Sequence, residues 1–248
     1  MASISETGHA NNVANLESLI ISATAFGTSY NPSRDCIKLP ALQTLLTASK
    51  ESLNVLNIAQ SAYSNAVSAR ESAFEPFSKL ITRVNNALKA SDTTVQVDES
   101  AETIVRKLQG RRASAKLTDE EKKALEAEGK EANQISAAQL SYDSKLENLD
   151  KLIMLLSSVP LYNPNEEDLK VDSLKTLYTE LKAKNTDVLT ATIQLSNARI
   201  ARNELLYKPI TGLIDIAFDF KVYIKSVFGA TSPQYKQISK LKFVDKKD

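Results

Sequence analysis

The chain contains two copies of one sequence segment, and this internal repeat constrains its fold more than any other feature. Residues 30–70 align without a gap to residues 162–202 at a constant offset of 132 positions, and fifteen of the forty-one aligned positions are identical. The identities are Tyr30/Tyr162, Asn31/Asn163, Pro32/Pro164, Lys38/Lys170, Leu42/Leu174, Thr44/Thr176, Leu45/Leu177, Thr47/Thr179, Lys50/Lys182, Ala59/Ala191, Ser64/Ser196, Asn65/Asn197, Ala66/Ala198, Ala69/Ala201 and Arg70/Arg202. Such self-similarity indicates a duplicated supersecondary unit.

The repeated unit is predicted to be helical. Only six glycines and seven prolines occur in 248 residues, and charged residues are spread along the chain, which is the composition of long helices with few turns. We predict an all-α fold, an elongated helical bundle in which each repeat is a helix, a turn, a long helix and a further helix. Pro40 suits the first turn of a long helix, and Pro76 ends it, because proline lacks the amide proton and clashes with the preceding turn.

The predicted boundaries follow the repeat. Residues 1–12 are polar and read as a flexible N-terminal arm, with the first helix starting at Val13. The first repeat spans 13–110, a linker spans 111–117, the second repeat spans 118–241, and a charged tail spans 242–248. In the second repeat we expect a long helix from about Asp172 to Leu206.

Apolar residues recur every seven positions along both long helices, so that one stripe of each helix is predicted to be buried. Leu56 and Val188 occupy equivalent positions on this stripe, and the alanines at 59/191 and 66/198 allow a neighbouring helix to approach closely. Leu189, Ile193 and Ile200 widen the apolar face, which predicts contact with two or more other helices.

Arg70 and Arg202 are cations on these otherwise apolar stripes. One interpretation is a buried site for an anion or a carboxylate. The other is an arginine whose aliphatic stem covers apolar surface while its guanidinium meets an internal partner. In either case the two arginines are expected to have equivalent surroundings.

The paired turns are the second candidate site. Tyr30, Asn31 and Pro32 recur as Tyr162, Asn163 and Pro164. They are either two recognition loops or two structural turns, in which the tyrosine packs on helix ends and the asparagine caps backbone groups.

The sequence lacks the residues that most catalytic and metal sites require. His9 is the single histidine and Cys36 the single cysteine, so no catalytic, metal or cofactor-binding residues are predicted. The net charge of +1, from 31 basic and 30 acidic residues, provides no field that would attract nucleic acid. One cysteine and no evident signal sequence favour a cytoplasmic protein, although an exported protein with few cysteines would have the same composition.

The most apolar region is 210–228, which four charged residues interrupt. It is either a core helix or a segment that unpacks and enters a membrane, although charges are costly in hydrocarbon.

The leading functional hypothesis is a non-catalytic structural, scaffold or self-associating protein that acts through protein–protein surfaces, with a second copy of itself as the expected partner. A membrane-active or toxin-like protein that uses residues 210–228 is the alternative. A ligand-binding protein or enzyme with an arginine–carboxylate site at Arg70 or Arg202 is the third hypothesis.

Overall fold

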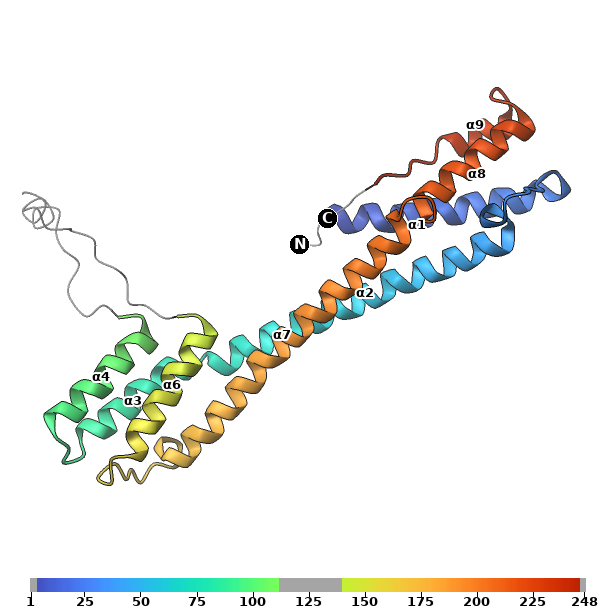
Figure 1. Ribbon diagram of the computed structural model, residues 1–248. Helices are drawn as coiled ribbons and strands as arrows, with labels where there is room; N and C mark the ends of the chain where they lie inside the picture. Colours follow the sequence, from blue (N-terminus) through green and yellow to red (C-terminus); the bar gives the residue numbers. More distant parts are fainter. Residues whose placement is uncertain (1–3, 112–139, 246–248) are drawn as a thin grey trace, which may run out of the picture. The chain divides into compact units, whose positions relative to one another are not determined.

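The computed structural model describes residues 4–111 and 140–245 (Figure 1), and this part of the chain is all-α, without any β-strand, as predicted. The helices are α1 (Ile4–Ala25), α2 (Leu39–Phe74), α3 (Phe77–Lys89), α4 (Val95–Gln109), α6 (Tyr142–Ser157), α7 (Val171–Tyr207), α8 (Leu213–Phe228) and α9 (Pro233–Ser239). All of the predicted linker 111–117 except its first residue lies outside the described residues, and so does the predicted start of the second repeat at residue 118.

Pro40 and Pro76 lie at the ends of α2 as predicted, and a glycine and a serine mark two further helix ends. Pro40 is the second residue of α2, and this helix ends at Phe74, just before Pro76. Gly229 has a φ of +86° and follows the last residue of α8. The side chain of Ser232 then caps α9 by accepting a hydrogen bond of 3.1 Å from the backbone nitrogen of Tyr235. These ends leave two long helices, α2 and α7, as the main elements.

The two repeated segments have the same local structure. Each has a 3-10 turn, Asp35–Ile37 in the first and Glu167–Leu169 in the second, and each turn leads directly into a long helix. The hydroxyl of Tyr30 donates to the carbonyl oxygen of Ile37, and that of Tyr162 donates to the carbonyl oxygen of Leu169. At these positions, 132 apart in the sequence, the two segments therefore make the same hydrogen bond.

The described residues fall into two compact units that do not follow the order of the repeats. Unit 1 consists of the described residues within Met1–Tyr63 and Ala191–Asp248, and unit 2 consists of those within Ser64–Thr190. The long helices are therefore divided, because the first part of α2 and the last part of α7 belong to unit 1, and their remaining parts to unit 2.

The core of unit 1 is formed by one side of α1 and one side of α8, together with the ends of α2 and α7. Its buried apolar residues are Val13, Leu16, Leu19, Ile20, Ala23, Tyr30, Ile37, Leu42, Leu206, Tyr207, Leu213, Ile214, Ile216, Ala217, Phe220, Ile224 and Ile238. Their spacing on α1 and α8 follows the helical period, which explains why both helices bury one side.

Unit 2 has a separate core, to which α3, α4, α6 and the first part of α7 contribute. Its buried apolar residues are Phe74, Phe77, Ile81, Val84, Leu88, Ala101, Val105, Leu108, Leu146, Leu149, Leu152, Ile153, Leu156, Tyr162, Leu169, Leu174 and Leu181. Each unit thus has its own hydrophobic core, which is the usual condition for a compact helical bundle.

The predicted stripe on the long helices is buried, since Leu56 is 3% exposed and Val188 is 6% exposed. In unit 1, a small cluster on α2 and α7 contains Leu56, Ala59, Leu195 and Ala198, with Tyr63 packed against it. The wider apolar face was predicted incorrectly. Leu189, Ile193 and Ile200 are exposed, because no described helix covers that side of α7.

The first helix begins earlier than the sequence predicted. It starts at Ile4 rather than Val13, so residues 4–12 are helical and not an arm of irregular chain. His9 and Asn12 are buried, and Asn12 exchanges hydrogen bonds of 2.8 and 3.1 Å with the backbone of Val244. Apolar periodicity could not reveal this start, because polar side chains make the contacts there.

The start of α4 does not lie at the residues with the side chains best suited to cap a helix. Asp98 and Ser100 have such side chains, whereas α4 begins at Val95. Asp98 is instead inside the first turn, where its carboxylate accepts a hydrogen bond of 2.8 Å from the Thr93 hydroxyl. An acidic residue is favourable near the positive end of the helix dipole.

Candidate functional site

Arg70 lies in unit 2 and contacts other side chains of that unit. Its guanidinium carbon lies 3.9 Å from the ring centroid of Tyr142, and Nη1 donates a hydrogen bond of 2.9 Å to Oδ1 of Asn185. The side-chain nitrogen of Asn185 in turn donates to Asp143 over 2.7 Å. A guanidinium on an aromatic face is stabilised by a cation–π interaction. Arg70 is therefore part of a hydrogen-bonded chain of side chains.

Arg202 lies in unit 1 and is completely buried, with 0% of its surface exposed. Its Nε and Nη2 atoms donate hydrogen bonds of 3.0 and 2.8 Å to Oδ1 of Asn203, the next residue of α7. The surroundings of the two arginines are not fully equivalent, because Arg202 is completely buried whereas Arg70 is only partly buried. Both arginines have internal hydrogen-bonding partners, which favours the interpretation as packed arginines, although the buried Nε atom of Arg70 has no hydrogen-bond partner.

The paired turns hold their tyrosines in equivalent ways but have different neighbours. In unit 1 the backbone nitrogen of Asn31 donates a hydrogen bond of 3.0 Å to the Tyr223 hydroxyl on α8. In unit 2, Asn163 and Pro164 line a shallow polar depression together with Arg83 and Asn86 of α3. The tyrosines act as structural residues, since both are buried and both close the turn by bonding to its backbone. Pro32 and Pro164 occupy the same position within the two turns.

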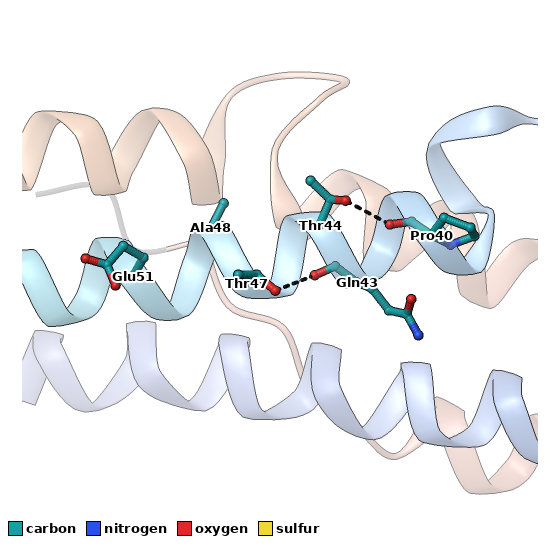
Figure 2. A pocket seen from close by; sticks show the side chains of 6 residues that line it. All are labelled: Pro40, Gln43, Thr44, Thr47, Ala48 and Glu51. Atoms are coloured by element: carbon teal, nitrogen blue, oxygen red, sulfur yellow. Dashed lines mark hydrogen bonds between the residues drawn. The ribbon is translucent and has the colours of Figure 1, made fainter.

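The depression along α2 in Figure 2 has no reactive group with an evident role. It is lined by Pro40, Gln43, Thr44, Thr47, Ala48 and Glu51, all from one side of that helix. The hydroxyls of Thr44 and Thr47 donate to the carbonyl oxygens of Pro40 and Gln43, one turn earlier, over 3.0 Å. Hydroxyls that bond to their own helix are typical of surface threonines.

Within residues 4–111 and 140–245, no group of three or more histidine, cysteine or acidic side chains is placed to hold a metal ion. Cys36 is a free thiol and is half-buried. Over the same part of the chain, no helix has the length and apolar character needed to span a bilayer.

The apolar region 210–228 forms α8 and the turn before it. Residues Leu213, Ala217, Phe220 and Ile224 are buried in the core of unit 1 and occupy one side of the helix. A role in a membrane would require these side chains to leave that core. Their packing supports the interpretation as a core helix.

In unit 1, the middle parts of α2 and α7 carry large apolar side chains whose exposure the sequence did not predict. Ile58 and Ile193 are each 62% exposed, Ile200 is 58% exposed, and Val55 is 45% exposed. The sequence has no charged side chain between Glu51 and Arg70, and none between Asp187 and Arg199. We call the exposed apolar residues within these two uncharged stretches, Val55 and Ile58 on α2 and Ile193 on α7, the neutral surface. The absence of charge in these two stretches is the feature of the sequence from which this surface could have been predicted.

No protein-family model matches this chain, and no curated protein sequence and no solved structure is significantly similar to it.

Proposed function

We propose that this chain is a non-catalytic, self-associating helical-bundle protein with a structural or scaffold role. The observation that carries the proposal is the neutral surface, where large apolar side chains of α2 and α7 are exposed. In this proposal the protein acts through a protein–protein surface, and its partner is a second copy of the same chain.

The composition of the neutral surface supports this proposal. In a chain with 25% charged residues, the stretches from Ser52 to Ala69 and from Val188 to Ala198 contain none. Charged residues are depleted from the cores of protein interfaces, because burying a charge costs free energy unless it is paired. A solvated helix face would instead be expected to carry the lysines and glutamates found elsewhere on α2 and α7.

A second copy is the partner that such a surface suits. When two identical surfaces pair about a twofold axis, each residue meets its own kind or a neighbour of the same patch. A charged patch would repel itself in this arrangement, whereas the neutral surface does not. Burial of Ile58 and Ile193 would contribute about 25 cal/mol for each Å² of apolar surface removed from water.

The single cysteine supports the proposed location. Cys36 has no second cysteine with which to form an intramolecular disulfide, and unpaired cysteines are typical of proteins in reducing compartments. We therefore place the protein in the cytoplasm.

The test is the molar mass of the purified full chain over a wide range of concentrations, measured by light scattering. We expect oligomers that dissociate on dilution and that Ile193→Lys weakens, because it would bury a lysine at the interface. Gln194→Lys, at an exposed neighbouring position of the same helix, is the matched control and should associate like the wild type. Monomers at every concentration would refute self-association.

A further inference from the structure

Each compact unit is assembled from both halves of the chain. Unit 1 takes α1 and the first part of α2 from the half before residue 112, and the last part of α7 with α8 and α9 from the half after residue 139. Unit 2 takes the last part of α2 with α3 and α4 from the first half, and α6 with the first part of α7 from the second. Neither half therefore contains a complete unit.

An ion pair joins the two halves within each unit, and the charges are reversed between the units. In unit 1, Arg34 in the turn of the first half lies 2.6 Å from Asp219 on α8 of the second half. In unit 2, Asp168 in the turn of the second half accepts two hydrogen bonds from Arg83 on α3 of the first half. Hydrogen bonding to Asp168 raises the pKa of the Arg83 guanidinium further above its usual value. The turn thus supplies the cation of the ion pair in one unit and the anion in the other.

Arg83 lies on α3 and Asp219 on α8, and these two helices have the same spacing of buried residues. Phe77, Ile81, Val84 and Leu88 are buried on α3, and Leu213, Ala217, Phe220 and Ile224 are buried at the same spacing on α8. This alignment has an offset of 136 (213 minus 77), and it places Arg83 at the position of Asp219. Equivalent positions on the two helices therefore carry opposite charges.

We propose that the two halves of the chain, 1–111 and 140–248, recognise one another as unlike partners, and that the complementary half of a second copy fits the same surfaces. Two first halves would bring Arg34 close to Arg83, and two second halves would bring Asp168 close to Asp219. Like charges in these places disfavour the wrong pairing while opposite charges favour the right one. The partner of each half is therefore a half of the other kind.

Aromatic packing in unit 1 also favours the pairing of a first half with a second half over the pairing of two first halves. The ring of Tyr30 lies 5.3 Å from that of Phe220 and 5.4 Å from that of Tyr223, measured between ring centroids. At the offset of 136, the equivalent residues on α3 are Val84 and Ala87. A pairing of two first halves would therefore remove both aromatic neighbours of Tyr30 and the hydroxyl that accepts a hydrogen bond from Asn31.

The test begins with the full chain, folded, carrying a protease recognition sequence inserted between Leu125 and Glu126. After cleavage we expect the two halves to elute as one complex in size-exclusion chromatography. When two cleaved preparations with different tags are mixed in mild denaturant and refolded, tagged first halves should pair with second halves of either preparation. Separate elution of the halves would overturn the proposal, and so would first halves that pair with one another as readily as with second halves.

Charge variants in the same cleaved chain test the ion pairs. Exposed ion pairs have modest effects, so we expect Arg83→Asp to weaken the association of the halves by about tenfold, combining a lost attraction with a new repulsion. Adding Asp168→Arg should restore most of the affinity. Lys79→Asp makes the same change of charge at an exposed position of α3 and should leave the affinity within about twofold to threefold. Equal weakening by Arg83→Asp and Lys79→Asp, or failure of Asp168→Arg to restore it, would refute recognition through this pair.

Discussion

The hydroxyl of Tyr162 donates a hydrogen bond of 2.7 Å to the backbone carbonyl oxygen of Leu169 and so closes the turn before α7. Tyr30 makes the same bond to Ile37 before α2. Both tyrosines are buried, and a buried carbonyl group that lost this donor would lack a hydrogen-bonding partner. The bond therefore fixes where each long helix starts.

We expect Tyr162→Phe to lower the free energy of unfolding by about 1 kcal/mol, the usual effect of removing one partner of a buried hydrogen bond. Phenylalanine keeps the ring in the core of unit 2, so the change reports on the hydroxyl. Urea denaturation at pH 7 measures it. Tyr178→Phe, at a partly exposed tyrosine of α7, is the control and should change stability little.

The burial of Tyr162 also predicts a dependence of stability on pH. Burial raises the pKa of Tyr162 from its ordinary value of 10.0 to about 12, and the nearby carboxylates of Asp168 and Glu166 add to the effect. The unfolded chain loses the proton near pH 10 while the folded chain keeps it, so the stabilisation is complete below pH 10 and is lost as the pH rises towards 12. The stability difference between wild type and Tyr162→Phe should therefore shrink across this range. Parallel stability curves from pH 8 to pH 12 would contradict the prediction.

The sequence predicted the ends of the helices better than it predicted which helices pack against one another. Pro76 and Gly229 end helices for local steric reasons, so these ends could be read from single residues. The assignment of helices to the two units could not be predicted. Periodicity shows which side of a helix is apolar but not which helix covers it. Ile193 illustrates this limit, because its spacing suggested burial and it is exposed.

The positions of the two candidate arginines could be predicted from the sequence, but the residues around them could not. The matching of Arg70 and Arg202 was visible in the sequence, but their partners depend on residues that do not match. Asn185, which bonds to Arg70, corresponds to Leu53 in the first repeat at the same offset. A repeat alignment therefore locates an equivalent residue without giving its hydrogen-bonding partner.

Arg202→Ala should be strongly destabilising, because Arg202 is among the largest completely buried side chains of the described residues. Removing a large buried side chain leaves a cavity and unpairs its partner, Asn203, so we expect a loss of about 3 kcal/mol. Arg199→Ala, three residues earlier and exposed, should cost less than about 1 kcal/mol. Denaturant unfolding of both variants gives the comparison, and equal losses would show that burial of Arg202 does not stabilise unit 1.

Ala198→Leu tests the close approach of α2 and α7 in unit 1. Ala198 is 7% exposed and packs in the cluster with Leu56 and Ala59. A leucine there would have to displace its neighbours, which costs about 1–3 kcal/mol in a packed core. Ala201→Leu adds the same atoms at an exposed position of α7 and is expected to be nearly neutral. A stable Ala198→Leu protein would show that the two helices are not closely packed at this level.

Ile210 is a strained residue, and its replacement should stabilise the protein. Its φ is +71°, a left-handed conformation that β-branched side chains avoid, and its side chain is 70% exposed. The backbone nitrogen of Ile210 donates a hydrogen bond of 2.6 Å to the Asp215 carboxylate, which holds the turn before α8 in this shape. We expect Ile210→Asn to raise the free energy of unfolding by about 1 kcal/mol, since asparagine tolerates this conformation better. Ile210→Val keeps the β-branch and should bring no gain. Lower stability of the Asn variant would mean that the exposed isoleucine makes a favourable contact that outweighs its backbone strain.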